Sequence, residues 1–166
     1  ISKGFVALNG VKQGGLLSPV LFCIYIDDLL IRLSCLGVGC YIGFDFVGAL
    51  AYADDIVLVA PTPSAMRLML ATCDSFAAEY DIIFNALKSN FLVFVASTHR
   101  FMRVSMVNCL FYIGGNPIVY APCYSHLGHI ISCDNMCRED IISRRNIFIG
   151  QVNNVICCFD KLSWYV

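Results

Sequence analysis

The sequence contains little charge. Asp, Glu, Lys and Arg make up 14% of its 166 residues, and the formal net charge is −1. The chain therefore lacks the broad positive field that many nucleic-acid-binding proteins carry, so a function of that class has to come from local sites. The first residues also lack an apolar core followed by a small-residue cleavage site, so we predict no signal peptide.

The sequence also lacks an unbroken apolar run of the length that a membrane-spanning helix needs. Hydrophobic residues make up 58% of the chain and the mean hydropathy is +0.73, values that alone would favour a membrane protein. The longest stretch without a charged residue, 104–133, is interrupted by Gly114-Gly115-Asn116-Pro117 and by Pro122. These residues break helices, so the stretch predicts buried strands and not a membrane span.

Nothing in the cysteine pattern indicates a disulfide-stapled scaffold. The ten cysteines are scattered along the chain, and most lie inside apolar runs, as in Phe22-Cys23-Ile24. Buried free thiols of this kind are typical of proteins in a reducing environment. We therefore expect reduced cysteines and an intracellular protein.

Three helices are predicted. The first begins with Ser18 as the cap and Pro19 in the first turn, and stops near Gly37. The second follows Pro61-Thr62-Pro63-Ser64 and places apolar residues three and four apart. The third spans about residues 138–159. We expect these third-helix residues to face inward: Ile141, Ile142, Phe148, Val152, Val155 and Phe159.

Strands are predicted between these helices. Residues 1–8 can form a short strand before a Gly-rich loop, and residues 49–59 read as a hairpin with two acids at its turn. Residues 82–84 and 92–95 are further strand candidates. The Gly114-Gly115-Asn116-Pro117 string predicts a turn between two apolar runs, and residues 124–131 read as a strand.

Two Tyr-x-Asp-Asp strings occur, at residues 25–28 and 52–55. Asp27 and Asp28 lie within the first predicted helix, where neighbouring side chains point about 100° apart. Asp54 and Asp55 lie at the predicted hairpin turn, where two adjacent carboxylates can face one point. Carboxylate oxygens are the ligands that Mg²⁺ prefers, so the second string is the candidate metal site, with an ordinary acidic turn as the alternative.

Three further motifs accompany the second string in a fixed order. Upstream lies the Gly-rich string Gly10-Val11-Lys12-Gln13-Gly14-Gly15, which leads into Ser18-Pro19. Downstream lie Phe84-Asn85-x-x-Lys88-Ser89 and Tyr124-Ser125-His126-Leu127-Gly128-His129. Together with the 52–55 string, these motifs resemble the catalytic core of reverse transcriptases of the non-LTR (LINE-type) retrotransposon family. The resemblance covers about residues 5–132.

The resemblance implies an α+β fold, the right-hand polymerase palm, in which an antiparallel sheet packs with helices. It divides the chain into a partial palm at residues 1–132 and a possible helical start of the thumb at residues 133–166. It implies template-directed addition of deoxynucleotides to a primer 3′-hydroxyl, with two Mg²⁺ ions, or Mn²⁺ in their place, about 4 Å apart. The implied partners are an RNA template, a DNA primer and deoxynucleoside triphosphates. The resemblance also makes the nucleus a possible location of this intracellular protein.

The resemblance also assigns residues. Asp54 and Asp55 would bind the metal ions, and Lys88 would stabilise the leaving pyrophosphate. The residues that would seat the nucleotide and template are Gln13, Gly14, Tyr52 and Asn85. Leu127 and Gly128, on a strand, would lie against the primer end.

One departure from the family pattern concerns a further catalytic acid, which the family carries on a strand upstream of the Gly-rich motif. Residues 1–9 contain no Asp or Glu. We therefore expect the palm to be incomplete at its N-terminal side and these 166 residues alone to be inactive. The fingers and the remaining thumb are expected in the rest of the polyprotein.

Two alternatives stay open. The first is a non-catalytic remnant or binding module derived from a reverse transcriptase. The second is an unrelated membrane or zinc-binding protein, since His126, His129, Cys133 and Cys137 could form a zinc set. Against zinc, two histidines three apart on one strand would point to opposite faces.

Overall fold

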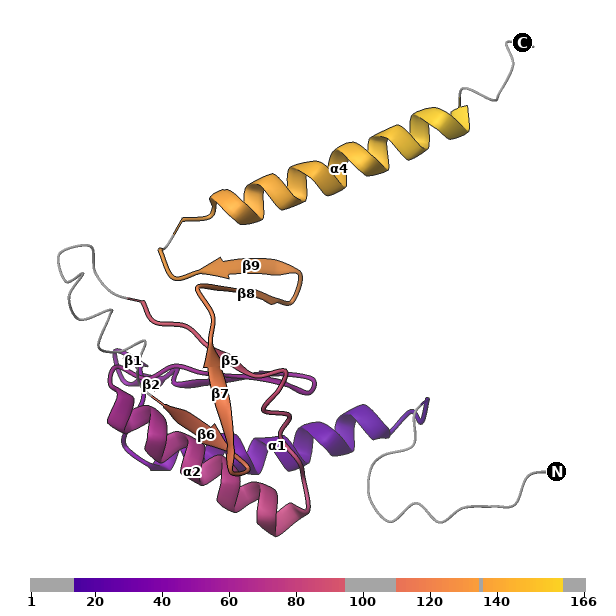
Figure 1. Ribbon diagram of the computed structural model, residues 1–166. Helices are drawn as coiled ribbons and strands as arrows, with labels where there is room; N and C mark the ends of the chain where they lie inside the picture. The colour runs from indigo at the N-terminus through magenta and orange to yellow at the C-terminus, as the bar shows by residue number, and fades with distance from the viewer. Residues whose placement is uncertain (1–13, 95–109, 135, 160–166) are drawn as a thin grey trace. The chain divides into compact units, whose positions relative to one another are not determined.

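Helix α1 spans Ser18–Cys35 in the computed structural model, which describes residues 14–94, 110–134 and 136–159 (Figure 1). Pro19 lies in the first turn, where a missing backbone N–H costs nothing. The cap position is held by Leu17, whose side chain has no acceptor atom, so the prediction that Ser18 caps the helix is wrong. The helix ends as predicted, before Gly37, which has a φ of 68°.

Helix α2 spans Pro63–Tyr80, as the apolar spacing predicted. The Thr62 hydroxyl oxygen accepts a hydrogen bond from the Ala65 backbone N–H at 3.2 Å, which satisfies one free donor of the first turn. At the other end Asp81 adopts a left-handed φ of 54°, and the Ile82 N–H donates to the Ala77 carbonyl at 2.9 Å.

The described residues divide into two compact units. The first takes in the described residues 14–89 and 110–118, and the second the described residues 90–94, 119–134 and 136–159. In the first unit α1 packs on α2, and α2 packs on strand β6 (Phe111–Ile113). Its centre is formed by fully buried side chains of the two helices: Leu29, Leu33, Met69 and Phe76. Burying one such side chain stabilises a fold by about 1.5–3 kcal/mol, so this contact is the main apolar core of the unit.

Arg32 joins the two helices at the edge of this core. Its guanidinium donates to both carboxylate oxygens of Glu79, at 2.6 and 3.1 Å, and lies 2.8 Å from Asp28. The Tyr80 hydroxyl donates to the same Asp28 carboxylate at 3.1 Å. The bonds to Arg32 lower the pKa of Glu79, and the bond to Asp28 raises the pKa of Tyr80, so both groups keep at neutral pH the protonation state that the contacts need.

Four short strands of the first unit form two antiparallel hairpins. Strand β1 (Tyr41–Ile42) pairs with β2 (Asp45–Phe46), and β3 (Ala49–Tyr52) pairs with β4 (Asp55–Leu58). The 49–59 hairpin was predicted and is confirmed. Helix α1 lies against β3, so the second hairpin is held from one side by the helix that precedes it.

Strand β7 (Asn116–Tyr120) pairs with β6 across a turn of two left-handed glycines, Gly114 and Gly115, which confirms that predicted turn. The end of β7 pairs in parallel with β5 (Asn90–Phe91). The strands predicted at residues 82–84 and 92–95 are wrong within the described residues, and residue 95 lies outside them. The Ile82 amide closes helix α2, so it cannot also enter a sheet.

The second unit contains a further antiparallel hairpin, β8 (Cys123–His126) and β9 (His129–Ser132), followed by α4 (Arg138–Phe159). The bounds of α4 are those predicted. Its predicted inward face is wrong, because none of its residues is buried and Phe148 and Phe159 are 64% and 65% exposed. The helix meets its unit at β9 (Figure 1). Among the described residues, its hydrogen bonds to the hairpin come from Asp140 and Arg144 in its first two turns. Among the described residues, every helix is too short or too polar to cross a bilayer.

The described cysteines form no disulfide with one another, and Cys109 lies outside the described residues. Burial, followed by the charge of Asp74, raises the pKa of Cys73 to about 12. Iodoacetamide at pH 8 should therefore modify Cys73 in the folded protein at least about a hundredfold more slowly than exposed Cys35, because only the thiolate reacts. In denatured protein kept from air, mass spectrometry should find all ten thiols modified. Bridged pairs, or rapid modification of Cys73, would contradict this.

Candidate active site

The 52–55 string forms the turn of the β3–β4 hairpin. Tyr52 ends β3 and lies opposite Asp55, the first residue of β4, so the turn itself consists of Ala53 and Asp54. Side chains of directly opposed residues share one face of a hairpin, which places the Tyr52 ring and the Asp55 carboxylate on the same side. The predicted strand–turn–strand setting of the two acids is confirmed.

The turn requires an unusual backbone conformation at Ala53, which has a left-handed φ of 51°. A residue with a Cβ atom rarely adopts this conformation, since it costs about 1–2 kcal/mol. Backbone bonds at the base of the hairpin oppose this cost. The Val59 N–H donates to the Gly48 carbonyl at 2.7 Å, and the Cys40 N–H donates to the Val59 carbonyl at 3.2 Å. The hairpin is thereby anchored to the segment that carries β1 and β2.

Both acids of this turn are exposed. Within the described ranges, no hydrogen bond or ion pair occupies the carboxylate of Asp54 or Asp55. Two free carboxylates fit one Mg²⁺, which usually takes one or two carboxylates together with phosphate oxygens and water. The same ranges contain no group of three or more acidic, histidine or cysteine side chains able to hold a metal ion. A second ion would therefore need a carboxylate that these residues do not supply.

The other Tyr-x-Asp-Asp string lies within α1, as predicted, and its acids are in a different state. Asp28 is bound by the Arg32 guanidinium at 2.8 Å and by the Tyr80 hydroxyl at 3.1 Å. Its neighbour Asp27 is exposed on the helix. The neutralised charge of Asp28 makes it a poor metal ligand, so only the hairpin string offers two unoccupied carboxylates side by side in the chain.

Asn85 and Lys88 lie together in one tight turn after α2. The Asn85 side-chain oxygen accepts a hydrogen bond from the Lys88 backbone N–H at 3.2 Å, and the Asn85 carbonyl accepts another from it at 3.1 Å. The Ser89 hydroxyl donates to the same carbonyl at 2.9 Å. The Asn85 oxygen is thus used inside the turn, which leaves its amide nitrogen for contact with a ligand. The Lys88 side chain is exposed.

Of the Gly-rich motif, Gly14 and Gly15 are described, whereas the residues up to Gln13 lie outside the described part, as does the strand predicted at residues 1–8. Gly14 has a left-handed φ of 78°, and a Cβ atom added there would meet nothing within 4 Å. The glycine is therefore required by the backbone conformation. Open space around it is compatible with the close approach of a ligand.

Leu127 and Gly128 were predicted to lie on a strand, and this prediction is wrong. They form the two-residue turn between β8 and β9. Both are left-handed, with φ of 50° and 77°. The turn makes His126 and His129 direct cross-strand partners. The expectation that these histidines point to opposite faces of one strand is therefore wrong, because they lie on two strands and share a face. No zinc set follows, since the described residues hold no metal-binding group of three.

Two functional candidates were missed in the sequence. Asp140, in the first turn of α4, binds the β8–β9 turn, and Arg32 joins α1 to α2. The spacings Asp28/Arg32 and Asp140/Arg144 are visible signals of helical ion pairs. Their long-range partners, Glu79 and Ile130, carry no such signal.

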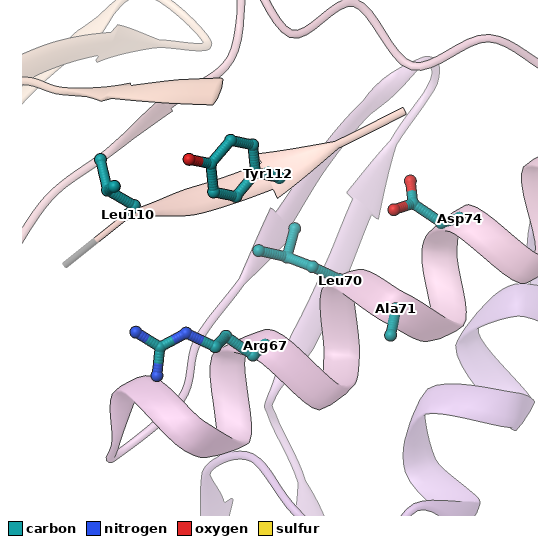
Figure 2. Close-up of a pocket in the computed structure, with 6 residues that line it drawn as sticks. All are labelled: Arg67, Leu70, Ala71, Asp74, Leu110 and Tyr112. Carbon is teal, nitrogen blue, oxygen red and sulfur yellow. The ribbon is translucent and has the colours of Figure 1, made fainter. Parts of the chain in front are cut away.

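A cavity of about 250 Å³ lies between α2 and β6, apart from all of these residues (Figure 2). Figure 2 shows Leu110 and Tyr112 on one side of it and the four lining residues of α2 on the other. Its charged lining residues are already in contact with neighbours, because Asp74 accepts from the Gly114 N–H at 2.7 Å and Arg67 lies 5.7 Å from the Phe111 ring centre. The cavity therefore contributes nothing to the candidate site. Its lining comprises Arg67, Leu70, Ala71, Asp74, Leu110 and Tyr112.

The chain belongs to the reverse transcriptase (RNA-dependent DNA polymerase) family, whose sequence model matches residues 2–131. Its similarity to known proteins is more specific than the family. It is 33% identical over 117 residues, 70% of the chain, to the Retrovirus-related Pol polyprotein from type-2 retrotransposable element R2DM of Drosophila melanogaster. It is 38% identical over 107 residues, 60% of the chain, to the Retrovirus-related Pol polyprotein from type-1 retrotransposable element R2 of Popillia japonica.

These matches cover 11% and 15% of the two relatives, so the chain spans less than a fifth of their length. A third relative, the corresponding R2 polyprotein of Nasonia vitripennis, is 35% identical over 89 residues, which is 54% of the chain and 9% of that protein. The resemblance inferred from the motifs is confirmed. The alternative of an unrelated membrane or zinc-binding protein is wrong, because the family match takes in most of the chain.

Proposed function

We propose that this chain is the catalytic palm of an RNA-directed DNA polymerase encoded by a retrotransposon. The observation that carries the proposal is the 52–55 hairpin, in which Asp54 and Asp55 are exposed, adjacent and unoccupied. It occurs inside the region that the family model matches. A right-hand palm at residues 1–132, incomplete at its N-terminal side, and the start of a thumb at residues 133–166 are part of the proposal.

In this proposal the substrates are deoxynucleoside triphosphates, a DNA primer and an RNA template. The protein would act inside the cell, with the nucleus as one location. Asp54 and Asp55 would bind Mg²⁺, with Mn²⁺ as a substitute. When bound, such ions neutralise charge on the reacting phosphates and activate the attacking hydroxyl. Lys88 would place a positive charge beside the leaving pyrophosphate. The Asn85 side chain holds the backbone of Lys88 in the tight turn that carries it.

The remaining residues would seat the substrates. Gln13 offers an amide to the nucleotide or template, and Gly14 lets the backbone approach it closely. Tyr52 presents an aromatic ring, 66% exposed, on the face that it shares with Asp55. Leu127 and Gly128 would meet the primer end from the tip of their hairpin.

Assayed alone with Mg²⁺, template and primer, the 166 residues should add no deoxynucleotides. Binding two ions at the required separation needs carboxylates from more than one strand, whereas Asp54 and Asp55 come from one turn and the described residues place no third ligand with them. The measurement is single-nucleotide addition by the purified chain, alone and joined to the preceding part of its reading frame. Activity of the joined protein only is the expected result.

Two other outcomes are informative. Asp54-dependent addition by the chain alone would contradict the expected inactivity, and would mean that another acid completes the site. Inactivity of the joined protein, or a stop codon in the preceding frame, would instead favour the remaining alternative, a non-catalytic remnant or binding module.

A further inference from the structure

Asp140 connects helix α4 to the tip of the β8–β9 hairpin. Its Oδ1 atom accepts a hydrogen bond from the Ile130 backbone N–H at 2.9 Å. Its Oδ2 atom lies 3.2 Å from His129 Nδ1 and accepts a bond from Arg144 Nε at 3.1 Å. One carboxylate thus contacts the strand that leaves the turn at two consecutive residues.

Arg144 completes the connection on the turn itself. While its Nε atom is bound to Asp140, a terminal guanidinium nitrogen donates to the Gly128 carbonyl at 3.1 Å. The backbone is therefore held at Gly128 and again at Ile130, on both sides of His129. Asp140 and Arg144 are four residues apart on a helix, so they present this pair of contacts as one preformed surface.

The charge on Asp140 suits this role. The Ile130 N–H, and then His129 and Arg144, lower the pKa of Asp140, so the carboxylate stays ionised at neutral pH. Asp140 is 17% exposed, compared with 61% for His129 and 49% for Arg144. The carboxylate is therefore the most enclosed member of the group and the one on which the other contacts converge.

The turn that these contacts hold is conformationally demanding. Leu127 and Gly128 both have left-handed φ, a conformation that leucine rarely adopts without support from its surroundings. We infer that Asp140 is a positioning residue for the primer end, which fixes the Leu127–Gly128 turn in the conformation that the primer terminus meets. This inference rests on the proposed function, which assigns that contact to the turn.

Whether replacing Asp140 weakens or tightens nucleic-acid binding distinguishes a positioning role from a simple effect of its negative charge. Nucleic acids are polyanions, so removing an acid from a surface that binds them should by charge alone tighten binding. Loss of positioning should weaken it. Glu139 is the matched control, because it is an acid in the same helical turn whose carboxylate has no hydrogen bond or ion pair with the described residues.

The test uses the full chain and a labelled DNA primer annealed to an RNA template, with affinity measured by fluorescence anisotropy. A blunt duplex of the same sequence reports binding that does not depend on a primer end. Asp140→Ala should raise the Kd for the recessed primer end about tenfold, the equivalent of one lost charged hydrogen bond, and leave the Kd for the blunt duplex nearly unchanged. Asp140→Asn, which keeps an acceptor oxygen, should lie between, and Glu139→Gln should not weaken binding.

Amide hydrogen exchange at Ile130 gives a second readout that needs no nucleic acid. Asp140→Ala should speed this exchange at least about tenfold, while Glu139→Gln leaves it unchanged. Unchanged exchange, or equal tightening of binding by both variants, would overturn the inference. Equal binding of recessed and blunt ends by the wild-type chain would count against the proposed function, and with it against a role of Asp140 at the primer end. The Ile130 exchange rate would still decide whether Asp140 holds the Leu127–Gly128 turn.

Discussion

Replacement of Asp54 by Asn should lower nucleotide addition at least about a thousandfold, since a bound metal ion stabilises the reacting charges by several kcal/mol. The substitution keeps the shape of the side chain and removes its charge, so the β3–β4 hairpin should persist. The measurement is single-turnover addition of one deoxynucleotide by the chain joined to the preceding part of its reading frame. A far-ultraviolet circular dichroism spectrum should show that the variant is folded.

Asp27→Asn is the matched control for this prediction, because Asp27 occupies the same place in the other Tyr-x-Asp-Asp string. It lies exposed on α1, and its neighbour Asp28 is already bound to Arg32. Most of the activity should therefore remain. A large loss with Asp27→Asn and a small loss with Asp54→Asn would show that the hairpin string is not the metal site.

Lys88→Ala should slow nucleotide addition by about a hundredfold to a thousandfold, the usual effect of removing one charge-stabilising donor. The backbone bonds of its turn are made by Asn85 and do not involve the Lys88 side chain, so the turn should survive the change. Single-turnover kinetics at saturating nucleotide measures the effect. An unchanged rate would indicate an ordinary solvent-exposed lysine.

Lys88→Arg distinguishes two ways in which this residue could act. Arginine keeps the positive charge but does not release a proton near neutral pH. Recovery of most of the rate would indicate that the charge stabilises the leaving pyrophosphate. A rate as low as that of the alanine variant would indicate that Lys88 donates a proton to it.

The elements that could be predicted are those with strong local signals. Helix α2 combines an apolar stripe with Thr62-Pro63 at its start, and the structure uses both. The 49–59 hairpin was recognisable because two β-type runs flank two acids. In each case the residues that determine the element lie within it, so no distant contact had to be known.

The errors arose where distant or unusual contacts decide the structure. Residues 82–84 have strand composition, yet the Ile82 amide closes α2. Leu127 lies in a turn with left-handed φ, and leucine is not a residue type from which such a turn can be predicted. In α4 the apolar spacing was read correctly as a helix, but a periodic pattern does not say whether any other part of the chain covers it.

The candidate site divides in the same way. The pairing of Tyr52 with Asp55 and the turn of Asn85 and Lys88 follow from local sequence, and both are present in the structure. The role of Asp28 depends on Arg32, Glu79 and Tyr80, which lie on two different helices. Likewise Asp140 acts on Ile130, ten residues away and on a strand. Contacts of this kind become visible only when the chain is folded.

The left-handed Ala53 sets limits on which sequences can replace this one. Glycine adopts the conformation freely and asparagine or aspartate tolerates it, whereas a β-branched side chain would clash with its own backbone. In a set of diverged copies of the gene, glycine, asparagine or aspartate should therefore be tolerated at position 53, whereas valine, isoleucine or threonine should be disfavoured there. A copy that carries one of these β-branched residues at position 53 should hold the turn that presents Asp54 less stably, even if both aspartates are intact.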